Sequence, residues 1–213
     1  MRTFLSVMFL AMLLFLPCNA QAARDNLRLT VLGDSLAAGY GLAPDEAFPA
    51  RLEEALRQAG CPVRVINAGV SGDTTAGGLA RLEWALADAP HIVLVELGGN
   101  DALRGLAPEH TQANLDAILG RLKERGVQPI LAGMLAPRNL GRDYYSAFDG
   151  IYPHLAEKHG VPLYPFFLEG VAGVPELNLP DGIHPNAQGI DEIVRRILPL
   201  VKDVARRQKG EVQ

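Results

Sequence analysis

Four short polar strings in this sequence contain residues that could act together in nucleophilic catalysis. Ser35 supplies a hydroxyl, Asp181 a carboxylate and His184 an imidazole, and Gly72 and Asn100 add N–H donors. A hydroxyl is a weak nucleophile until a base removes its proton, and histidine is the side chain whose pKa suits that task near neutral pH. The sequence therefore holds the inventory of an acyl-transfer site.

The spacing of these residues suggests a function for each. Asp181 lies three residues before His184 in a tight turn, so its carboxylate can hold one imidazole nitrogen and present the other to Ser35. The tetrahedral intermediate of acyl transfer needs donors for its negative oxygen. We predict that the oxyanion hole consists of the backbone N–H groups of Ser35 and Gly72 and the side-chain amide of Asn100.

Short apolar runs alternate with longer segments of helical periodicity. The runs predict strands at Arg28–Leu32, Val63–Ile66, His91–Leu97, Pro129–Leu135 and Val161–Tyr164. The helical periodicity predicts helices at Phe48–Gln58, Thr74–Ala87, Pro108–Arg125, Arg142–His159 and Asn186–Arg207, with a kink or interruption at Pro199. This alternation predicts an α/β fold, in which a five-stranded parallel sheet has helices on both faces.

The polar strings fall where the predicted strands end. The string with Ser35 follows the first strand, the string with Gly72 follows the second, and the string with Asn100 follows the third. The string from Asp181 to His184 precedes the last helix. Because open α/β sheets bind ligands at the carboxyl ends of their strands, we expect all four strings on one rim.

Each string also has an ordinary structural interpretation. Ser35 alone could cap a helix or lie in a loop, and the segment from Asp181 to His184 could be a turn held by an Asx hydrogen bond. Gly98-Gly99-Asn100-Asp101 alone reads as a strand-to-helix turn, and Gly72 as a turn before a helix. Their joint placement on one rim favours the site.

Other classes of site lack their signatures. No Gly-x-Gly-x-x-Gly pattern follows the first predicted strand, which argues against a dinucleotide site. The other histidines are scattered, without the spacing of metal ligands. Ala37 stands where the nucleophile elbow of α/β-hydrolases has its second glycine, which argues against that fold.

The N-terminus has the pattern of a secretory signal peptide. Arg2 is followed by an apolar stretch and by the small-x-small string Ala20-Gln21-Ala22, so we expect cleavage near Ala22 and a periplasmic or secreted protein. Residues 1–22 are thus the predicted leader, and residues 23–213 a single domain. The net charge of −4 argues against a nucleic-acid partner. We expect a monomer with at most peripheral membrane contact.

The four strings resemble, in order, the four conserved blocks of the SGNH (GDSL) hydrolases. They are Gly33-Asp34-Ser35-Leu36, Val70-Ser71-Gly72-Asp73-Thr74, Gly98-Gly99-Asn100-Asp101 and Asp181-Gly182-Ile183-His184-Pro185. The fuller strings Val95 to Asp101 and Pro165-Phe166-Phe167 are similar to the periplasmic thioesterase, lysophospholipase and arylesterase subgroup.

This resemblance implies a flavodoxin-like three-layer α/β/α sandwich. It also implies a Ser35 nucleophile, a partner pair of Asp181 and His184, and an oxyanion hole made by Ser35, Gly72 and Asn100. Members of the family need no metal or organic cofactor, so we expect neither here. The resemblance further implies that the segment from Asp101 to Leu106 borders the acyl site.

We therefore expect a serine hydrolase that cleaves acyl esters and thioesters through an acyl-serine intermediate. By resemblance, the substrates are small acyl esters or lysophospholipids. A carbohydrate O-acetyl esterase of the same fold and a non-catalytic carrier of lipids or acyl chains are the alternatives. The predicted substrate contacts are mostly apolar, which favours an acyl chain, although Leu103 and Leu106 could equally be core: Asp34, Leu36, Leu103, Leu106 and Ile183.

Overall fold

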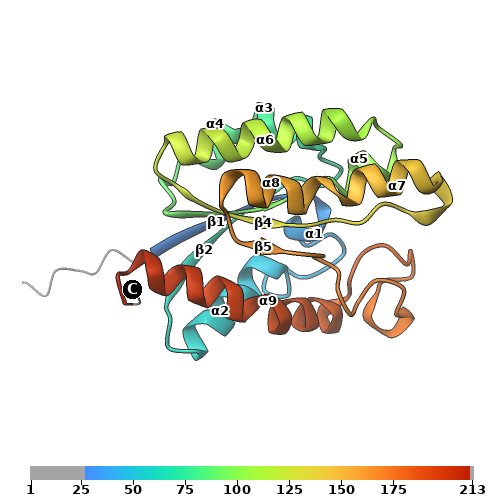
Figure 1. Cartoon of the computed structure of the whole chain (residues 1–213). Helices are drawn as coiled ribbons and strands as arrows, with labels where there is room; N and C mark the ends of the chain where they lie inside the picture. The colour runs from blue at the N-terminus through green and yellow to red at the C-terminus, as the bar shows by residue number, and fades with distance from the viewer. Residues whose placement is uncertain (1–26, 212–213) are drawn as a thin grey trace, which may run out of the picture.

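A computed structural model of the chain describes residues 27–211 (Figure 1). The predicted signal peptide, residues 1–22, lies outside the described residues. Within residues 27–211, none of the helices is both long enough and apolar enough to cross a membrane.

The middle layer of the fold is a parallel sheet of five strands (Figure 1). The strands are β1 (Leu27–Gly33), β2 (Val63–Gly69), β3 (Ile92–Glu96), β4 (Gln128–Ala132) and β5 (Leu163–Tyr164). Their order in the sheet is β2-β1-β3-β4-β5, and all four pairings are parallel. This is the flavodoxin-like order, which confirms the predicted fold class and places the switch point, where such folds bind ligands, between β1 and β3.

The sheet is apolar because both of its faces are covered. All five residues of β3 are buried, and β1 is buried at every position except Arg28. A strand that is buried on both faces has apolar residues at successive positions rather than at every second one. For this reason β1 and β3 could be recognised in the sequence as continuous apolar runs. β2 is an edge strand with four apolar residues and a mixed burial pattern.

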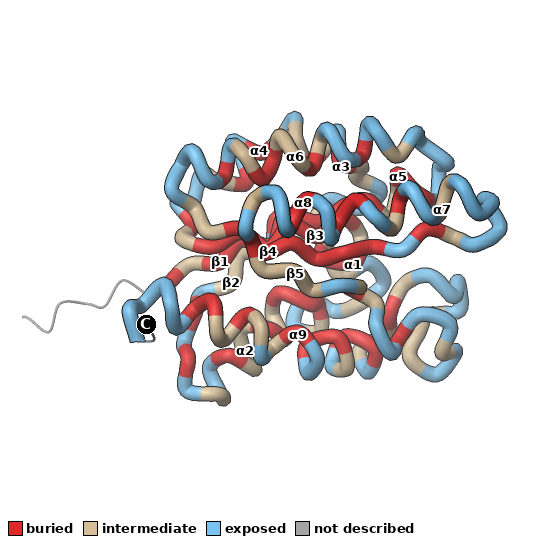
Figure 2. The backbone as a smooth tube through the Cα atoms, viewed as in Figure 1, coloured by how far each residue is buried: buried red, intermediate tan, exposed pale blue. Residues whose placement is uncertain are grey.

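Helices cover both faces of the sheet, with α2 and α9 on one and α3, α4, α6 and α8 on the other (Figures 1 and 2). The helices are α1 (Ser35–Ala38), α2 (Phe48–Gln58), α3 (Thr75–Ala80), α4 (Leu82–Ala85), α5 (Gly99–Leu103), α6 (Pro108–Glu124), α7 (Arg142–Asp149), α8 (Ile151–His159) and α9 (Ala187–Gln208). Two 3₁₀ turns lie at Arg138–Leu140 and Pro175–Leu177. Figure 2 shows that the buried stretches of the outer helices face the sheet.

Two helix predictions were wrong in detail. The predicted helix Thr74–Ala87 is divided into α3 and α4 at Arg81, and the predicted helix Arg142–His159 is divided into α7 and α8 at Gly150. Of the two effects predicted for Pro199, an interruption does not occur, since α9 continues through this residue, and a kink stays a prediction. Ile190, Ile193 and other apolar residues at helical spacing bury one face of α9, and this packing outweighs the hydrogen bond that the proline removes.

Candidate active site

The end of β1 delivers Ser35 to the carboxyl edge of the sheet. Ser35 is the first residue of α1, and the Asp34 side chain caps this short helix by accepting the N–H of Leu36 at 3.0 Å. Gly33 is required just before the turn, because a Cβ there would lie 2.4 Å from a carboxylate oxygen of Glu96. The close packing of Gly33 against β3 fixes where the strand ends and the helix begins.

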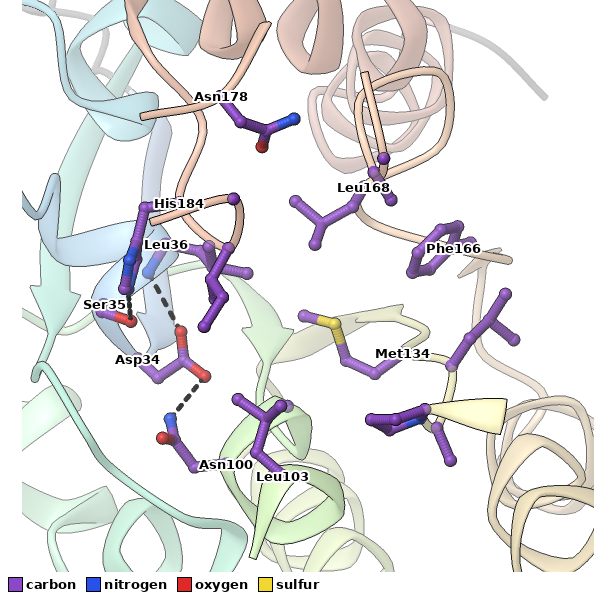
Figure 3. A pocket seen from close by; sticks show the side chains of 18 of the residues that line it. Asp34, Ser35, Leu36, Asn100, Leu103, Met134, Phe166, Leu168, Asn178 and His184 are labelled. Atoms are coloured by element: carbon purple, nitrogen blue, oxygen red, sulfur yellow. Dashed lines mark hydrogen bonds between the residues drawn. The ribbon is translucent and has the colours of Figure 1, made fainter. Parts of the chain in front are cut away.

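The loop before α9 brings a histidine and an aspartate to this serine. The Nε2 atom of His184 lies 2.9 Å from the Oγ atom of Ser35, and its Nδ1 atom lies 2.8 Å from the Oδ2 atom of Asp181. The loop is held in shape by the N–H of Leu179, which donates to the carbonyl of His184 at 2.7 Å. Figure 3 shows the imidazole directed at the serine hydroxyl. The three groups form a continuous chain, in which the imidazole can accept the serine proton.

The Asp181 carboxylate is fixed by the backbone as well as by the imidazole. Its Oδ1 atom accepts the N–H groups of His184 at 3.0 Å and Ile183 at 2.9 Å. These two backbone hydrogen bonds, and then the bond to the His184 ring, lower the pKa of Asp181 to about 2. The carboxylate is therefore ionised across the neutral range and can stabilise the positive charge of a protonated His184.

Three residues with N–H donors follow the first three strands of the chain: Ser35 after β1, Gly72 after β2 and Asn100 after β3. Among residues 27–211, the backbone N–H groups of Ser35 and Gly72 have no hydrogen-bond partner, which leaves both free for an oxyanion. Gly72 has a φ of +80°, a conformation that L side chains rarely adopt. The amide of Asn100 donates one N–H to Asp34 at 3.0 Å, so its second N–H remains available. This bond ties Asn100 to the residue before Ser35, and the oxyanion hole of Ser35, Gly72 and Asn100 stays a prediction.

Arg81, which was not among the site residues predicted from the sequence, stabilises the loop that contains Gly72. The guanidinium of Arg81 donates to the carbonyls of Gly33 at 2.9 Å and Ala68 at 2.7 Å, at the ends of β1 and β2. It also pairs with Asp73 at 2.6 Å. Since one planar guanidinium joins both strand ends to the residue after Gly72, it fixes the loop relative to the nucleophile.

A buried aspartate supports Asn100 in the same way. Asp101 is 1% exposed and accepts the backbone N–H of Thr75 at 2.9 Å and its hydroxyl at 2.5 Å. The hydroxyl of Thr111 in α6 is a third donor, at 3.2 Å. This network ties the helix that carries Asn100 to the start of α3, directly after the Gly72 loop.

Two buried carboxyl groups lie close to Ser35 in the structure. Burial raises the pKa of Asp34 to about 6, although hydrogen bonds from Leu36 and Asn100 oppose the shift. Glu96, at the end of β3, is fully buried and accepts the N–H of Asp34 at 3.2 Å. Burial, with the charge of Asp34 as a second cause, raises the pKa of Glu96 well above its usual value, which favours its neutral form.

A cleft of about 430 Å³ opens beside Ser35 and His184 (Figure 3). The side chains of Met134, Phe166 and Leu168 form its far wall, opposite the triad. The sequence analysis placed residues 133–135 in the fourth strand, but β4 ends at Ala132, and the chain turns there to line the cleft. An apolar cleft that begins at a nucleophile fits an aliphatic chain attached to the reacting carbonyl.

The structure separates the predicted substrate contacts into three groups. Leu36, Leu103 and Ile183 line the cleft. Asp34 also borders it, but it is 2% exposed and its carboxylate is engaged by Leu36 and Asn100, so it orients the site rather than facing solvent. Leu106 does not line the cleft, because the chain turns away after α5 and leaves this residue exposed on the surface.

Other residues of the site had weaker signals in the sequence. Tyr40 packs on the His184 ring with centroids 4.4 Å apart, and only its position shortly after the Ser35 string hinted at this. Met134 and Leu168 follow the fourth and fifth strands, so they could have been inferred from strand ends alone. Within residues 27–211, no group of three or more histidine, cysteine, aspartate or glutamate side chains could hold a metal ion.

The chain is similar to known proteins over most of its length. Residues 31–191 match the GDSL-like Lipase/Acylhydrolase family. An arylesterase from Vibrio mimicus is 42% identical over 183 residues, which covers 85% of this chain and 91% of that protein. The thioesterase 1/protease 1/lysophospholipase L1 of Escherichia coli is 42% identical over 205 residues, 94% of each protein.

A solved structure shows the same similarity in three dimensions. AlinE4, an SGNH-hydrolase family esterase, has a TM-score of 0.72 and 50% sequence identity with this chain. The match covers 84% of this chain and 97% of that one.

Proposed function

The chain belongs to the GDSL-like lipase/acylhydrolase family and is an ester hydrolase, and from this premise we propose that it cleaves acyl esters and thioesters through an acyl-Ser35 intermediate. The observation that carries the proposal is the hydrogen-bonded chain from Ser35 through His184 to Asp181 at the inner end of an apolar cleft. The proposed catalytic residues are therefore Ser35, His184 and Asp181.

The reaction proceeds in two halves. In the first, the Oγ atom of Ser35 attacks the acyl carbonyl carbon while Nε2 of His184 takes the hydroxyl proton. The carbonyl oxygen becomes an oxyanion that accepts hydrogen bonds from the N–H groups of Ser35, Gly72 and Asn100. The intermediate then collapses, the bond to the alcohol or thiol breaks, and His184 returns the proton to this leaving group.

In the second half, water releases the acyl group. His184 takes a proton from the water as its oxygen attacks the acyl-Ser35 carbonyl carbon, and the same donors hold the second oxyanion. The ester bond to Ser35 breaks, and the proton passes from His184 to the serine oxygen. The products are a carboxylic acid and the regenerated hydroxyl.

The cleft supports an aliphatic acyl chain as the recognised part of the substrate. Leu36, Leu103 and Ile183 lie near the triad, and Phe166 and Leu168 extend the apolar lining away from it. By similarity to the relatives named above, the proposed substrates are aryl esters, acyl thioesters and lysophospholipids.

The proposed site of action is the periplasm or the outside of the cell. The support for it is the signal-peptide pattern of residues 1–22, with cleavage after Ala22. N-terminal sequencing of the protein from intact cells tests this, since a chain beginning at Ala23 is expected and a chain that retains Met1 in the cytoplasm would contradict it.

The experiment is hydrolysis of p-nitrophenyl esters from acetate to palmitate by the enzyme and by Ser35→Ala. We expect the highest kcat/KM at medium or long chains, and a loss on the order of 10⁴-fold or more in the variant. Activity confined to acetate would instead favour a carbohydrate O-acetyl esterase. A protein with no activity on any ester would be a carrier of acyl chains.

A further inference from the structure

Exposed apolar side chains are concentrated on the face that carries the active site. Eight large apolar side chains are exposed in residues 27–211, and seven of them follow the carboxyl ends of strands: Tyr40, Val70, Leu103, Leu106, Leu135, Leu140 and Ile183. The eighth, Trp84, is in α4, at the end of the molecule away from α5 and α7 (Figure 1). Apolar exposure that is concentrated at one end of the sheet indicates a binding surface rather than chance.

Five of these residues form what we call the apolar rim: Leu103, Leu106, Leu135, Leu140 and Ile183. Their exposed fractions range from 37% to 55%. Leu103, Leu135 and Ile183 line the cleft, so the rim surrounds its opening. Leu106 and Leu140 lie outside the cleft. The hydroxyl of Tyr144 in α7 donates to the carbonyl of Leu106 at 2.8 Å, which joins the two sides of the rim.

Arginines are interspersed with the apolar rim. Arg104 stands between Leu103 and Leu106, and Arg142 follows Leu140 by two residues; both are exposed. Neither forms an ion pair with another residue of the described chain, and Arg104 donates only to the carbonyl of Gly72. Guanidinium groups without an ion-pair partner can bind phosphate oxygens, and the exposed leucines beside them can contact hydrocarbon. A lipid surface offers both, since its phosphate headgroups lie above its hydrocarbon chains.

We propose that the apolar rim docks on a lipid surface with phosphate headgroups, so that an acyl chain enters the cleft directly from the aggregate. The leucines enter the outer hydrocarbon while Arg104 and Arg142 contact phosphate oxygens. This inference rests on the proposed function and adds the physical state in which the enzyme meets a lipid substrate.

The position of the rim favours a lipid surface over a protein partner. A protein seated on the rim would cover the cleft opening, because three rim residues are also cleft residues. A lipid surface supplies the acyl chain at the same opening, so the apolar chain does not have to pass through water, where its exposure is unfavourable.

The test is sedimentation with vesicles of phosphatidylcholine containing one part in four of phosphatidylglycerol. The chain is prepared from residue 23, since the described fold lies within residues 27–211 and an apolar leader would bind lipid by itself. Ser35→Ala is used throughout to prevent hydrolysis. We expect the double substitution Leu106→Ser and Leu140→Ser to weaken vesicle binding about tenfold or more.

Two controls make the result specific. Trp84→Ser removes a more exposed apolar side chain away from the rim and should leave vesicle binding within twofold. Arg142→Gln should weaken binding to the anionic vesicles several-fold and change binding to pure phosphatidylcholine little. Equal loss in Trp84→Ser and in the rim variant would overturn the proposal.

Binding and turnover are measured separately, so the two proposals can fail independently. With Ser35 restored, the rim variant should hydrolyse a short soluble ester at the unsubstituted rate, since Leu106 and Leu140 lie outside the cleft. If the unsubstituted chain hydrolyses that ester but binds no vesicles, the docking proposal is wrong and a protein partner is the better candidate. If it binds vesicles through the rim but hydrolyses nothing, the proposed function is wrong and the docking surface stands.

Discussion

Two aspartates within this site ionise at opposite ends of the acidic range, for reasons visible at each residue. Asp181 lies at the surface, where two backbone N–H groups and the His184 ring lower its pKa to about 2. Asp34 is enclosed, and burial raises its pKa to about 6. The first is thus a permanent anion for the imidazole, and the second changes charge close to working pH.

Replacing Asp181 by asparagine should lower kcat by a factor on the order of 10³ to 10⁴ and leave the fold intact. The amide oxygen can still accept the backbone N–H groups of the turn, but the amide NH₂ would face Nδ1 of His184 and favour the wrong tautomer. Kinetics on p-nitrophenyl butyrate measure the loss, with the exposed Asp143→Asn as control. A kcat within threefold of the unsubstituted value would reduce Asp181 to a turn residue.

Asp34→Asn should make stability less dependent on pH. Because the folded pKa of about 6 lies above the unfolded value, Asp34 contributes stability at low pH that is lost as pH rises through 6. Asparagine does not titrate, so the variant does not lose stability in this way. The free energy of unfolding of the variant minus that of the unsubstituted protein should therefore increase on the order of 2 kcal/mol between pH 4.5 and pH 7.5. Urea unfolding at each pH measures this difference. A difference that stays constant with pH would contradict the raised pKa.

At the scale of elements, the site depends on contacts between the ends of neighbouring strands and the loops after them. Arg81 joins the ends of β1 and β2, Asp101 joins α5 to α3, and Glu96 supports the start of α1 from the end of β3. Each contact is made by a polar side chain that does not itself line the cleft. The positions of the reacting groups are therefore determined by elements that meet only in the folded sheet.

Glu96 gives a direct test of this support. Glu96→Gln keeps a side-chain oxygen that can accept the N–H of Asp34, so we expect stability within about 1 kcal/mol and kcat within threefold of the unsubstituted enzyme. Glu96→Leu leaves that N–H buried and unpaired, which should cost about 1 to 3 kcal/mol and reduce kcat further by displacing Ser35. Thermal unfolding and steady-state kinetics compare the two. If the glutamine variant were as impaired as the leucine variant, Glu96 would have to be ionised.

The bounds of some elements can be predicted from the sequence more closely than those of others. β1 and β3 are continuous apolar runs because both faces are covered, so their positions could be predicted to within two residues. The end of β4 could not, because Met134 and Leu135 are apolar for a different reason, as parts of the cleft. The helix break at Arg81 was also unpredictable, since the contacts that hold this arginine lie on strands distant in sequence.

In the whole molecule, the parallel topology of the sheet brings the residues of the site together. The groups next to Ser35 come from positions up to 149 residues away along the chain, yet they meet at one edge because every strand points there. This could be predicted from the order of strands and helices. The course of the long loop that brings His184 to 2.9 Å from Ser35 could not, because hydrogen bonds such as that from Leu179 to the His184 carbonyl have no local sequence pattern.

The same topology explains why the acyl cleft and the apolar rim share one face. Loops that follow parallel strands emerge together, and in this chain those after β3 and β4 contribute exposed leucines, the one after β5 contributes Ile183, and all three contribute to the lining. The opposite end of the sheet lacks such loops and, within the described residues, exposes only Trp84 among its large apolar side chains.

The proposed reaction depends on a covalent intermediate at Ser35, which His184 activates. The most direct measurement is mass spectrometry of the protein after treatment with a p-nitrophenyl alkylphosphonate, which forms a stable adduct with an activated serine. We expect one adduct per chain, on the peptide that contains Ser35, with labelling abolished in Ser35→Ala and slowed at least about 100-fold in His184→Ala. An adduct on another residue, or labelling of Ser35→Ala at the unsubstituted rate, would contradict the account.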